Sequence, residues 1–177
     1  YYKVDAEIIS KLMLCLELAM GGYIIYLGVK NKKYLISLLM LIQGIIVVWM
    51  EVSLLKDIHI ENNMFIDKFS LIMAIIVGII GSLICLYSVG YMEDYQHHHK
   101  EVKDQRRKFF IVIFVFLSAM YGIVFSNNLM WLYFFWEITT LCSFLLIGYT
   151  GTDEASKNAF RALLINLVGG LAFALAL

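Results

Sequence analysis

Proline is absent from the 177 residues of this chain, and only 16% of the residues are charged. Without proline, a break inside a helix has to come from glycine or from segments beyond the end of the sequence. The formal net charge is zero, so the charge balance gives no indication of a nucleic-acid partner.

Cysteine is also scarce. The chain has three cysteines, at Cys15, Cys85 and Cys142, and they form no C-x-x-C pair. This pattern gives no support to iron–sulfur, haem or zinc ligation, so we expect no cofactor and no metal site. Any electron chemistry that the protein serves then takes place in another subunit.

Apolar residues dominate the composition. Hydrophobic residues make up 62% of the chain, and the mean hydropathy is +0.81. Runs close to the ~20 residues that a helix needs to cross a membrane predict six spans. They lie at about 8–29, 34–51, 69–92, 109–126, 129–149 and 158–177. The expected fold is therefore an all-α, polytopic transmembrane helix bundle, with about six spans in this fragment.

The ends of the sequence lead us to expect a piece of a longer protein. The chain begins at Tyr1 rather than at a methionine, and the helical pattern of 160–177 still continues at Leu177. No cleavable signal peptide is evident in the first apolar run, which is about as long as a full span.

The charges in the loops predict the orientation. The loops at 30–33 and 93–108 are rich in lysine and arginine. The loop at 52–68 has two lysines against three acids, namely Lys56, Lys68, Asp57, Glu61 and Asp67. Because cytoplasmic loops carry the excess of positive charge, the N-terminus is predicted to face outside a multi-pass protein of the cell inner (cytoplasmic) membrane. The 126–128 turn is then external and the 150–157 loop cytoplasmic.

Two carboxylates lie deep within predicted spans. Glu137 is in the middle of the run 129–147, and Glu17 is about nine residues into the first span. A charge near the bilayer midplane costs roughly 2.5–3.5 kcal/mol on insertion scales, and such residues commonly mark ion paths. We therefore interpret Glu137 as a proton-transfer residue and Glu17 as a second protonatable site. The alternative for Glu17 is a contact with a partner subunit.

A polar stripe accompanies Glu137 along its helix. At 100° per residue, it consists of Tyr133, Trp136, Thr140 and Ser143, all within about 120° of Glu137. Such a stripe can hold a water chain or a partner ammonium group, so these hydroxyls are candidates for a proton path. The alternative is that Glu137 only bonds a neighbouring helix, as Gln43 is expected to do.

Other features have structural explanations beside the functional ones. Lys157 and Arg161, at the mouth of the sixth span, either guide protons or follow the orientation rule. Ala74, Gly78 and Ser82 indicate a helix-packing face. The residues at 97–99 are three histidines, and they are expected in a solvated loop rather than at a metal.

Four segments of the chain resemble a known family in their order and spacing. They are FIDKFSLIM at 65–73, YSVGYM at 87–92, SNNLMWLY at 126–133, and WE at 136–137 followed by LLIG at 145–148. In this order they resemble the N-terminal part of the antiporter-like membrane subunits. That family is shared by respiratory complex I (its large distal subunit, NADH dehydrogenase subunit 5 type), Mrp-type sodium/proton antiporters and energy-converting membrane-bound hydrogenases.

The resemblance implies an ion pump module. Family members pair a glutamate on the fifth helix, at the position of Glu137, with a lysine on a broken seventh helix, which would follow Leu177. It also implies a division into 1–64, with two transmembrane helices and an external loop, and 65–177, the start of the proton-translocating domain, truncated in the sixth helix. Gly170 stands where the distal complex I subunit looks to have an aspartate, so the glycine pair 169–170 is closer to the Mrp and hydrogenase-linked relatives.

The sequence therefore favours an ion-translocating subunit of a redox-driven complex, such as complex I or a membrane-bound hydrogenase, with the proton as the expected ion. Its partners would be other membrane subunits, a peripheral redox module and the lipid bilayer. An Mrp-type sodium/proton antiporter subunit is the first alternative, and a structural membrane anchor is an alternative of another class. The choice between H⁺ and Na⁺ stays open, since the selective residues would follow Leu177.

Overall fold

The computed structural model describes residues 6–53, 62–98 and 104–176. This part of the chain forms six helices without a strand. They are α1 (Ala6–Lys30), α2 (Tyr34–Ser53), α3 (Lys68–His98), α4 (Arg106–Phe125), α5 (Leu129–Ile147) and α6 (Asp153–Ala176). All six are long and apolar enough to cross a membrane. The predicted all-α transmembrane bundle is confirmed.

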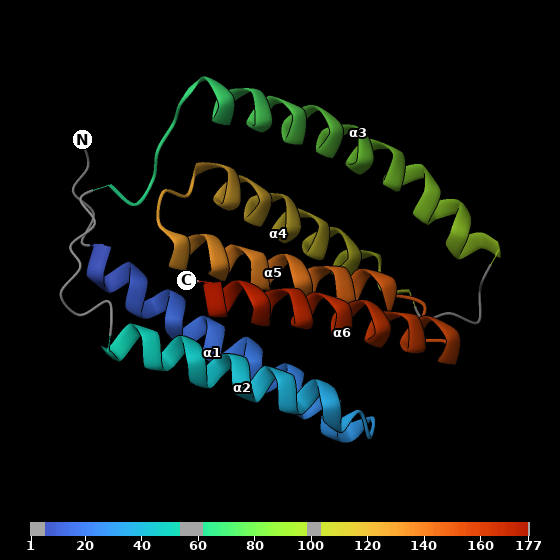
Figure 1. Cartoon of the computed structure of the whole chain (residues 1–177). Coiled ribbons are helices and arrows are strands. Elements are labelled where there is room, and N and C mark those ends of the chain that lie inside the picture. The colour runs from blue at the N-terminus through green and yellow to red at the C-terminus, as the bar shows by residue number, and fades with distance from the viewer. Residues whose placement is uncertain (1–5, 54–61, 99–103, 177) are drawn as a thin grey trace.

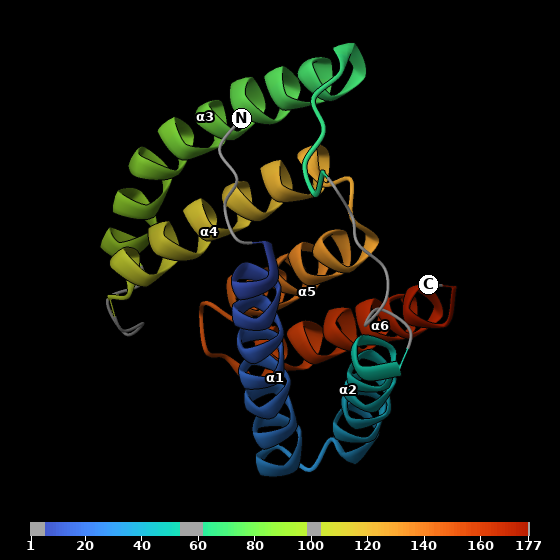
Figure 2. The same ribbon diagram turned by 90° about the vertical axis from the view of Figure 1, so that its left-hand side faces the viewer.

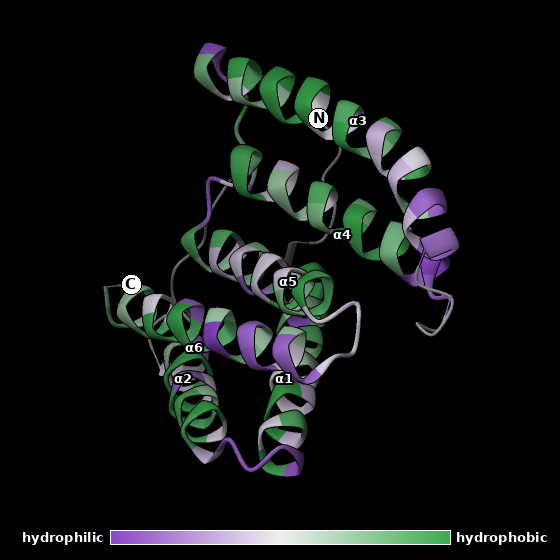
Figure 3. Ribbon diagram, turned by 90° about the vertical axis from the view of Figure 1, so that its right-hand side faces the viewer, coloured by the Kyte–Doolittle hydropathy of each residue, from purple (hydrophilic) through white to green (hydrophobic). Residues whose placement is uncertain are grey.

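Successive helices run in opposite directions (Figure 1). The α1–α2 turn, the end of α3 and the α5–α6 turn lie at one end of the bundle, and the 126–128 turn and the end of α6 lie at the other. Hydrophilic residues gather at the first of these ends, along the last turns of α3, the α1–α2 turn and the start of α6 (Figure 3). This arrangement matches the alternation that the loop charges predicted, although which end faces the cytoplasm stays a prediction.

Helix α5 occupies the centre of the arrangement. It packs against α4, α6 and α1, whereas α3 packs only against α4 among the described residues. The pair α1–α2 lies on the side of α5 and α6 that is remote from α3 (Figure 2). A side chain in the middle of α5 is therefore enclosed by its neighbours, while most of α3 faces outward.

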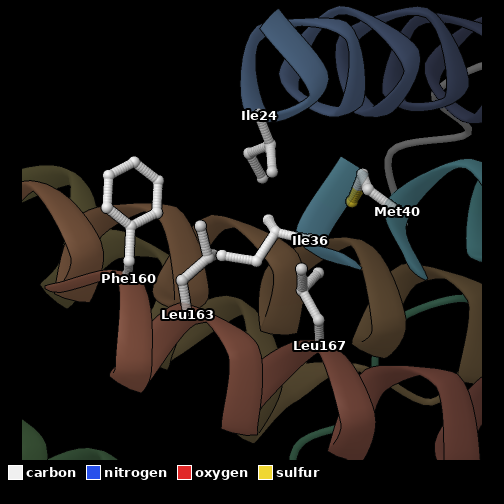
Figure 4. Packing of buried hydrophobic residues seen from close by; sticks show 6 residues of the cluster. All are labelled: Ile24, Ile36, Met40, Phe160, Leu163 and Leu167. Atoms are coloured by element: carbon white, nitrogen blue, oxygen red, sulfur yellow. The ribbon is translucent and has the colours of Figure 1, made fainter. Parts of the chain in front are cut away.

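A buried apolar cluster fastens the α1–α2 pair to α6. Ile24 comes from α1, Ile36 and Met40 come from α2, and α6 contributes Phe160, Leu163 and Leu167 (Figure 4). Lipid tails are as apolar as these side chains, so close packing, rather than exclusion from water, holds the helices together here.

Polar side chains set where the helices begin. At the start of α3, Asp67 accepts hydrogen bonds from the backbone N–H and the hydroxyl of Ser70, both at 2.6 Å. These bonds hold the pKa of the Asp67 carboxyl below its usual value. Asn128 accepts from the Met130 N–H at 2.9 Å at the start of α5. These contacts satisfy backbone donors that have no partner inside the helix.

The turn between α5 and α6 leads directly into a helix N-terminus. Thr152 accepts from the Ala155 N–H at 3.2 Å, and Asp153 and Glu154 occupy the first turn of α6, as expected from residues that favour a helix N-terminus. Gly151 has φ of +68°, a left-handed conformation that glycine adopts without a steric penalty. Glycine therefore allows the chain to reverse direction at this point.

Helix α3 extends farther than predicted. The sequence indicated an end near residue 92 and a loop that included the histidines, but α3 continues to His98. The placement of His97 and His98 in a loop was wrong. Beyond the membrane the backbone can remain helical with polar side chains, and Tyr87, Tyr91 and Tyr95 stack on successive turns. His99 lies outside the described residues. The same holds for 54–61 and 100–103, which include lysines and acids counted in the prediction of the orientation.

The packing face of α3 is rotated from the predicted one. Ala74 is buried and Gly78 faces α4, but Ser82 is exposed, and the buried residue at this level is Gly81. Ser70 and Ser88 complete the small-residue face. Residues spaced by four move gradually around a helix of 3.6 residues per turn. The face that contacts α4 therefore passes from Gly78 to Gly81, a step of three residues.

The Gly78 contact allows a direct test of this face. A Cβ atom at Gly78 would lie 2.6 Å from the Tyr121 hydroxyl on α4, whereas nothing lies within 4 Å of the equivalent point at Gly90 on the same helix. Gly78→Leu should therefore lower the yield and thermal stability of the detergent-solubilised protein, by about 1–3 kcal/mol. Gly90→Leu is the control and should leave both unchanged. Equal stability of the two variants would show that α3 does not pack on α4 by this face.

Candidate functional site

Glu137 lies in the middle of the central helix. It is eight residues after the first residue of α5 and ten before the last. Its side chain is only 2% exposed, although the residues around it are mostly aromatic and aliphatic. A buried carboxyl group in apolar surroundings needs hydrogen-bond donors or a compensating positive charge.

The donor comes from another helix. Gln43, in the middle of α2, is 1% exposed and donates a hydrogen bond from Nε2 to Oε1 of Glu137 at 2.5 Å. Its Nε2 also donates to the hydroxyl of Tyr133. Gln43 was predicted to join two helices, and the structure confirms this and identifies its partner as Glu137.

Tyr133 shares the Gln43 amide with Glu137. It lies one turn before Glu137 on α5, is fully buried, and its hydroxyl accepts from the same Nε2 of Gln43 that donates to Glu137. We call Glu137, Gln43 and Tyr133 the polar triad. It is the hydrogen-bonded link between α2 and α5 at mid-membrane depth.

Gly170 on α6 makes room for the polar triad. A Cβ atom at Gly170 would lie 2.8 Å from Nε2 of Gln43 and 3.0 Å from Oε1 of Glu137, but one at Gly169 would meet nothing within 4 Å. The two glycines of α6 therefore differ in role. Gly170 allows the backbone of α6 to approach the carboxyl group, and Gly169 faces open space.

Two oxygens of the polar triad have no hydrogen-bond partner among the described residues. They are Oε2 of Glu137 and Oε1 of Gln43, and both are buried. The ion pairs seen in the described part of the chain, His98–Asp94 and Arg106–Asp104, lie near helix ends. The structure thus leaves two acceptors at the centre of the bundle that a proton or a cation could engage.

The other residues of the predicted stripe divide into two groups. Thr140 is buried on α5, as is Tyr133. Ser143 is half-buried and donates to the carbonyl of Thr139 on its own helix at 2.8 Å, and Trp136 is partly exposed and packs against Phe173. The structure therefore brings Tyr133 to Glu137 and turns Trp136 away from it.

Lys157 and Arg161 are not part of this site. Both are exposed near the start of α6, thirteen and nine residues before Gly170, respectively. At 1.5 Å per residue they lie roughly 13–20 Å along the helix from the level of the polar triad. Any role of theirs in ion movement would concern entry or exit at the bundle end.

Glu17 is buried on α1, as the sequence indicated, and it lines a cleft together with Gln43 and Tyr133. Sequence reasoning found both carboxylates but missed that Gln43 serves the site and that Gly170 borders it. The available signal was the position of Gln43: an amide at the centre of an apolar span has to bond another buried polar group.

Comparison with known proteins places the chain in a family. The family model described as "NADH-Ubiquinone oxidoreductase (complex I), chain 5 N-terminus" matches residues 49–110. A second, described as "NADH:quinone oxidoreductase/Mrp antiporter, TM", matches residues 126–177. The chain belongs to the antiporter-like subunit family. The resemblance found in the sequence is confirmed.

Individual relatives are named as antiporter subunits. The Na(+)/H(+) antiporter subunit A1 of Staphylococcus haemolyticus is 31% identical over 156 residues, which is 88% of this chain and 18% of the relative. The Na(+)/H(+) antiporter subunit A1 of Staphylococcus aureus strain JH9 is 36% identical over 110 residues, which is 62% of this chain and 13% of the relative. This chain of the antiporter-like family thus spans less than a fifth of these relatives. No solved structure matches it.

The two glycines of α6 provide a matched test of the polar triad. Gly170→Ala should displace Gln43 or Glu137 and destabilise the solubilised protein by about 1–3 kcal/mol, because the new methyl group is closer to them than packed atoms allow. Gly169→Ala adds the same group on the open side and should leave the melting temperature unchanged. A Gly170→Ala variant as stable as the Gly169→Ala control would contradict the close approach of α6.

Proposed function

We propose that this chain is the part of a Na⁺/H⁺ antiporter subunit of the Mrp type that holds the ion-accepting glutamate, Glu137. The observation that supports the proposal is the polar triad: a buried carboxyl group that receives a donor from a second helix and retains a free oxygen. The printed names of the relatives, both Na(+)/H(+) antiporter subunits, support antiport as the activity.

The triad suits a carboxyl group that changes its charge. When Glu137 is ionised, the hydrogen bond from Gln43 partly balances its charge, and the buried Tyr133 hydroxyl is bonded to the same amide nitrogen. The free Oε2 is the atom that can take up a proton or face an approaching cation. In this proposal Gln43 and Tyr133 position the carboxyl group, and Glu137 carries the proton.

Thr140 extends the proposed path along α5. Its side chain is buried one turn after Glu137, on the side of the helix that Tyr133 also occupies. Ser143 lies farther along, half-buried, and Lys157 and Arg161 stand at the end of the bundle beyond it. We propose that a proton released from Glu137 leaves in this direction.

A redox-driven complex is the second candidate. The match to the complex I chain 5 description over residues 49–110 favours it, since that family couples ion movement to a redox module. The partners would then be a peripheral redox module in addition to other membrane subunits. A mere membrane anchor is disfavoured, because an anchor has no need of a buried carboxyl group at mid-membrane depth.

Replacement of Glu137 tests the proposal. Glu137→Gln preserves shape, and its amide carbonyl can still accept from Gln43, so the complex should assemble normally. The new group cannot take up a proton, so Na⁺-dependent proton movement in everted membrane vesicles should fall to background. Glu154→Gln, at an exposed position in the first turn of α6, is the control and should retain activity. Wild-type transport by the Glu137→Gln protein would remove this residue from the mechanism.

The proposed orientation is tested by labelling at the two ends of the bundle. In a background without Cys15, Cys85 and Cys142, His98→Cys at the end of α3 should resist an impermeant thiol reagent until the cells are opened. Asn127→Cys, at the exposed turn before α5, should react in intact cells. The opposite labelling pattern would invert the topology and place the N-terminus in the cytoplasm.

A further inference from the structure

A cleft of about 550 Å³ lies between α1 and α2. Its polar lining consists of Glu17, Gln43, Ser53 and Tyr133, and the remainder is mostly aliphatic. Along α2 it extends from Met40 to Ser53, which is about 20 Å at 1.5 Å per residue. Ser53 is the last residue of α2, so the cleft connects the level of Gln43 with the bundle end that also contains the 126–128 turn (Figure 1).

Glycines create this space. Gly21, Gly22 and Gly44 all line the cleft, and a Cβ atom at Gly22 or Gly44 would meet nothing within 4 Å. The volume is many times the roughly 30 Å³ that one water molecule occupies in the liquid. The cleft therefore has room for a small ion together with water molecules.

The polar groups that line the cleft offer oxygen atoms that can accept a hydrogen bond or coordinate a cation. Gln43 is held in one orientation, because its Nε2 donates to both Glu137 and Tyr133, and a reversed amide would place its oxygen against the carboxylate. Its Oε1 is thereby left buried without a hydrogen-bond partner among the described residues. The carboxyl group of Glu17 and the Tyr133 hydroxyl oxygen line the same cleft.

The charges around Glu17 are negative on each helix that packs against α1. From α5, Glu137 interacts electrostatically with Glu17, and from α2, Glu51 does so as well. Tyr133 of α5 is the other titratable group that borders the cleft. Buried acids and acceptor oxygens are stabilised by a cation, and no lysine or arginine of the described residues contributes to the charge around Glu17.

From this arrangement we infer that the cleft between α1 and α2 is a second ion site, at which the Glu17 carboxylate, the free amide oxygen of Gln43 and the Tyr133 hydroxyl oxygen hold one small monovalent cation. The cation is a sodium ion, which oxygen acceptors can hold. The inference deepens the proposed function and depends on it for the role of the site in transport. Cation binding itself does not depend on it, and it can be tested separately.

Carbodiimide labelling tests binding without transport. A hydrophobic carbodiimide modifies a protonated carboxyl group in an apolar cleft, and an ion that displaces the proton slows the reaction. In the purified whole complex, we expect Glu17 to be modified, as measured by peptide mass spectrometry. Protection by NaCl but not by choline chloride at constant pH assigns sodium. Labelling that falls only as the pH is raised reflects ordinary ionisation of the carboxyl group and overturns a cation site. Modification that neither condition changes, or no modification, overturns the site.

Filling the cleft provides the matched control. Gly44→Leu places a side chain into the open space of the cleft without meeting a neighbour at Cβ, so the protein should fold and Glu17 labelling should fall several-fold. Gly169→Leu fills open space on α6 and should leave the labelling unchanged. Equal labelling of Glu17 in the two variants would show that the cleft is not the route to this carboxyl group.

Transport measurements separate the two proposals. Glu17→Gln should raise the Na⁺ concentration for half-maximal antiport roughly tenfold or more, the scale seen when the surroundings of a bound metal are changed. Glu137→Gln should instead abolish transport and leave the labelling of Glu17 in place. A Glu17→Gln protein with wild-type ion and pH dependence contradicts a role of the cleft in transport, whatever the outcome at Glu137.

Discussion

The hydrogen bond from Gln43 to Glu137 is the constraint around which the centre of the bundle is arranged. In the membrane interior a carboxyl group without a donor is costly, so α2 has to present its amide at the depth of Glu137 on α5. That requirement fixes the register of α2 against α5, and the apolar cluster with α6 fixes its rotation. Gly170 then allows α6 to lie close to both side chains. The position of three helices thus follows from one polar contact and the glycine beside it.

Gly170 also bears on which branch of the family the chain resembles. The resemblance implies an aspartate at this position in the distal subunit of complex I, and an aspartate here would put a second carboxyl group beside Glu137. Two carboxylates in such a place repel each other, and one of them takes a proton. With glycine, the neighbour of Glu137 is instead a neutral amide that donates to it. The local chemistry therefore differs from that implied for the complex I subunit.

The six helices and the buried position of both carboxylates could be predicted, because membrane spans depend on local hydropathy and on length. The predictions were wrong where the hydropathy pattern is weak. Helix α3 continues past the membrane through polar residues to His98, where water satisfies side chains and hydropathy no longer marks the helix. On the same helix, the choice between Ser82 and Gly81 depends on its rotation against α4. The pairing of Gln43 with Glu137 joins residues 94 positions apart, and no local pattern predicts such a contact.

The orientation of the Gln43 amide links the two proposed ion sites. One end of this group donates to Glu137, and the other is a free oxygen on a residue that lines the cleft with Glu17. A cation at the oxygen and a negative charge at the nitrogen polarise an amide in the same direction, so each interaction strengthens the other. Protonation of Glu137 removes the negative charge and weakens the hold on a cation in the cleft. A proton at one site and an ion at the other are then mutually unfavourable, which is the relation that exchange of the two ions requires.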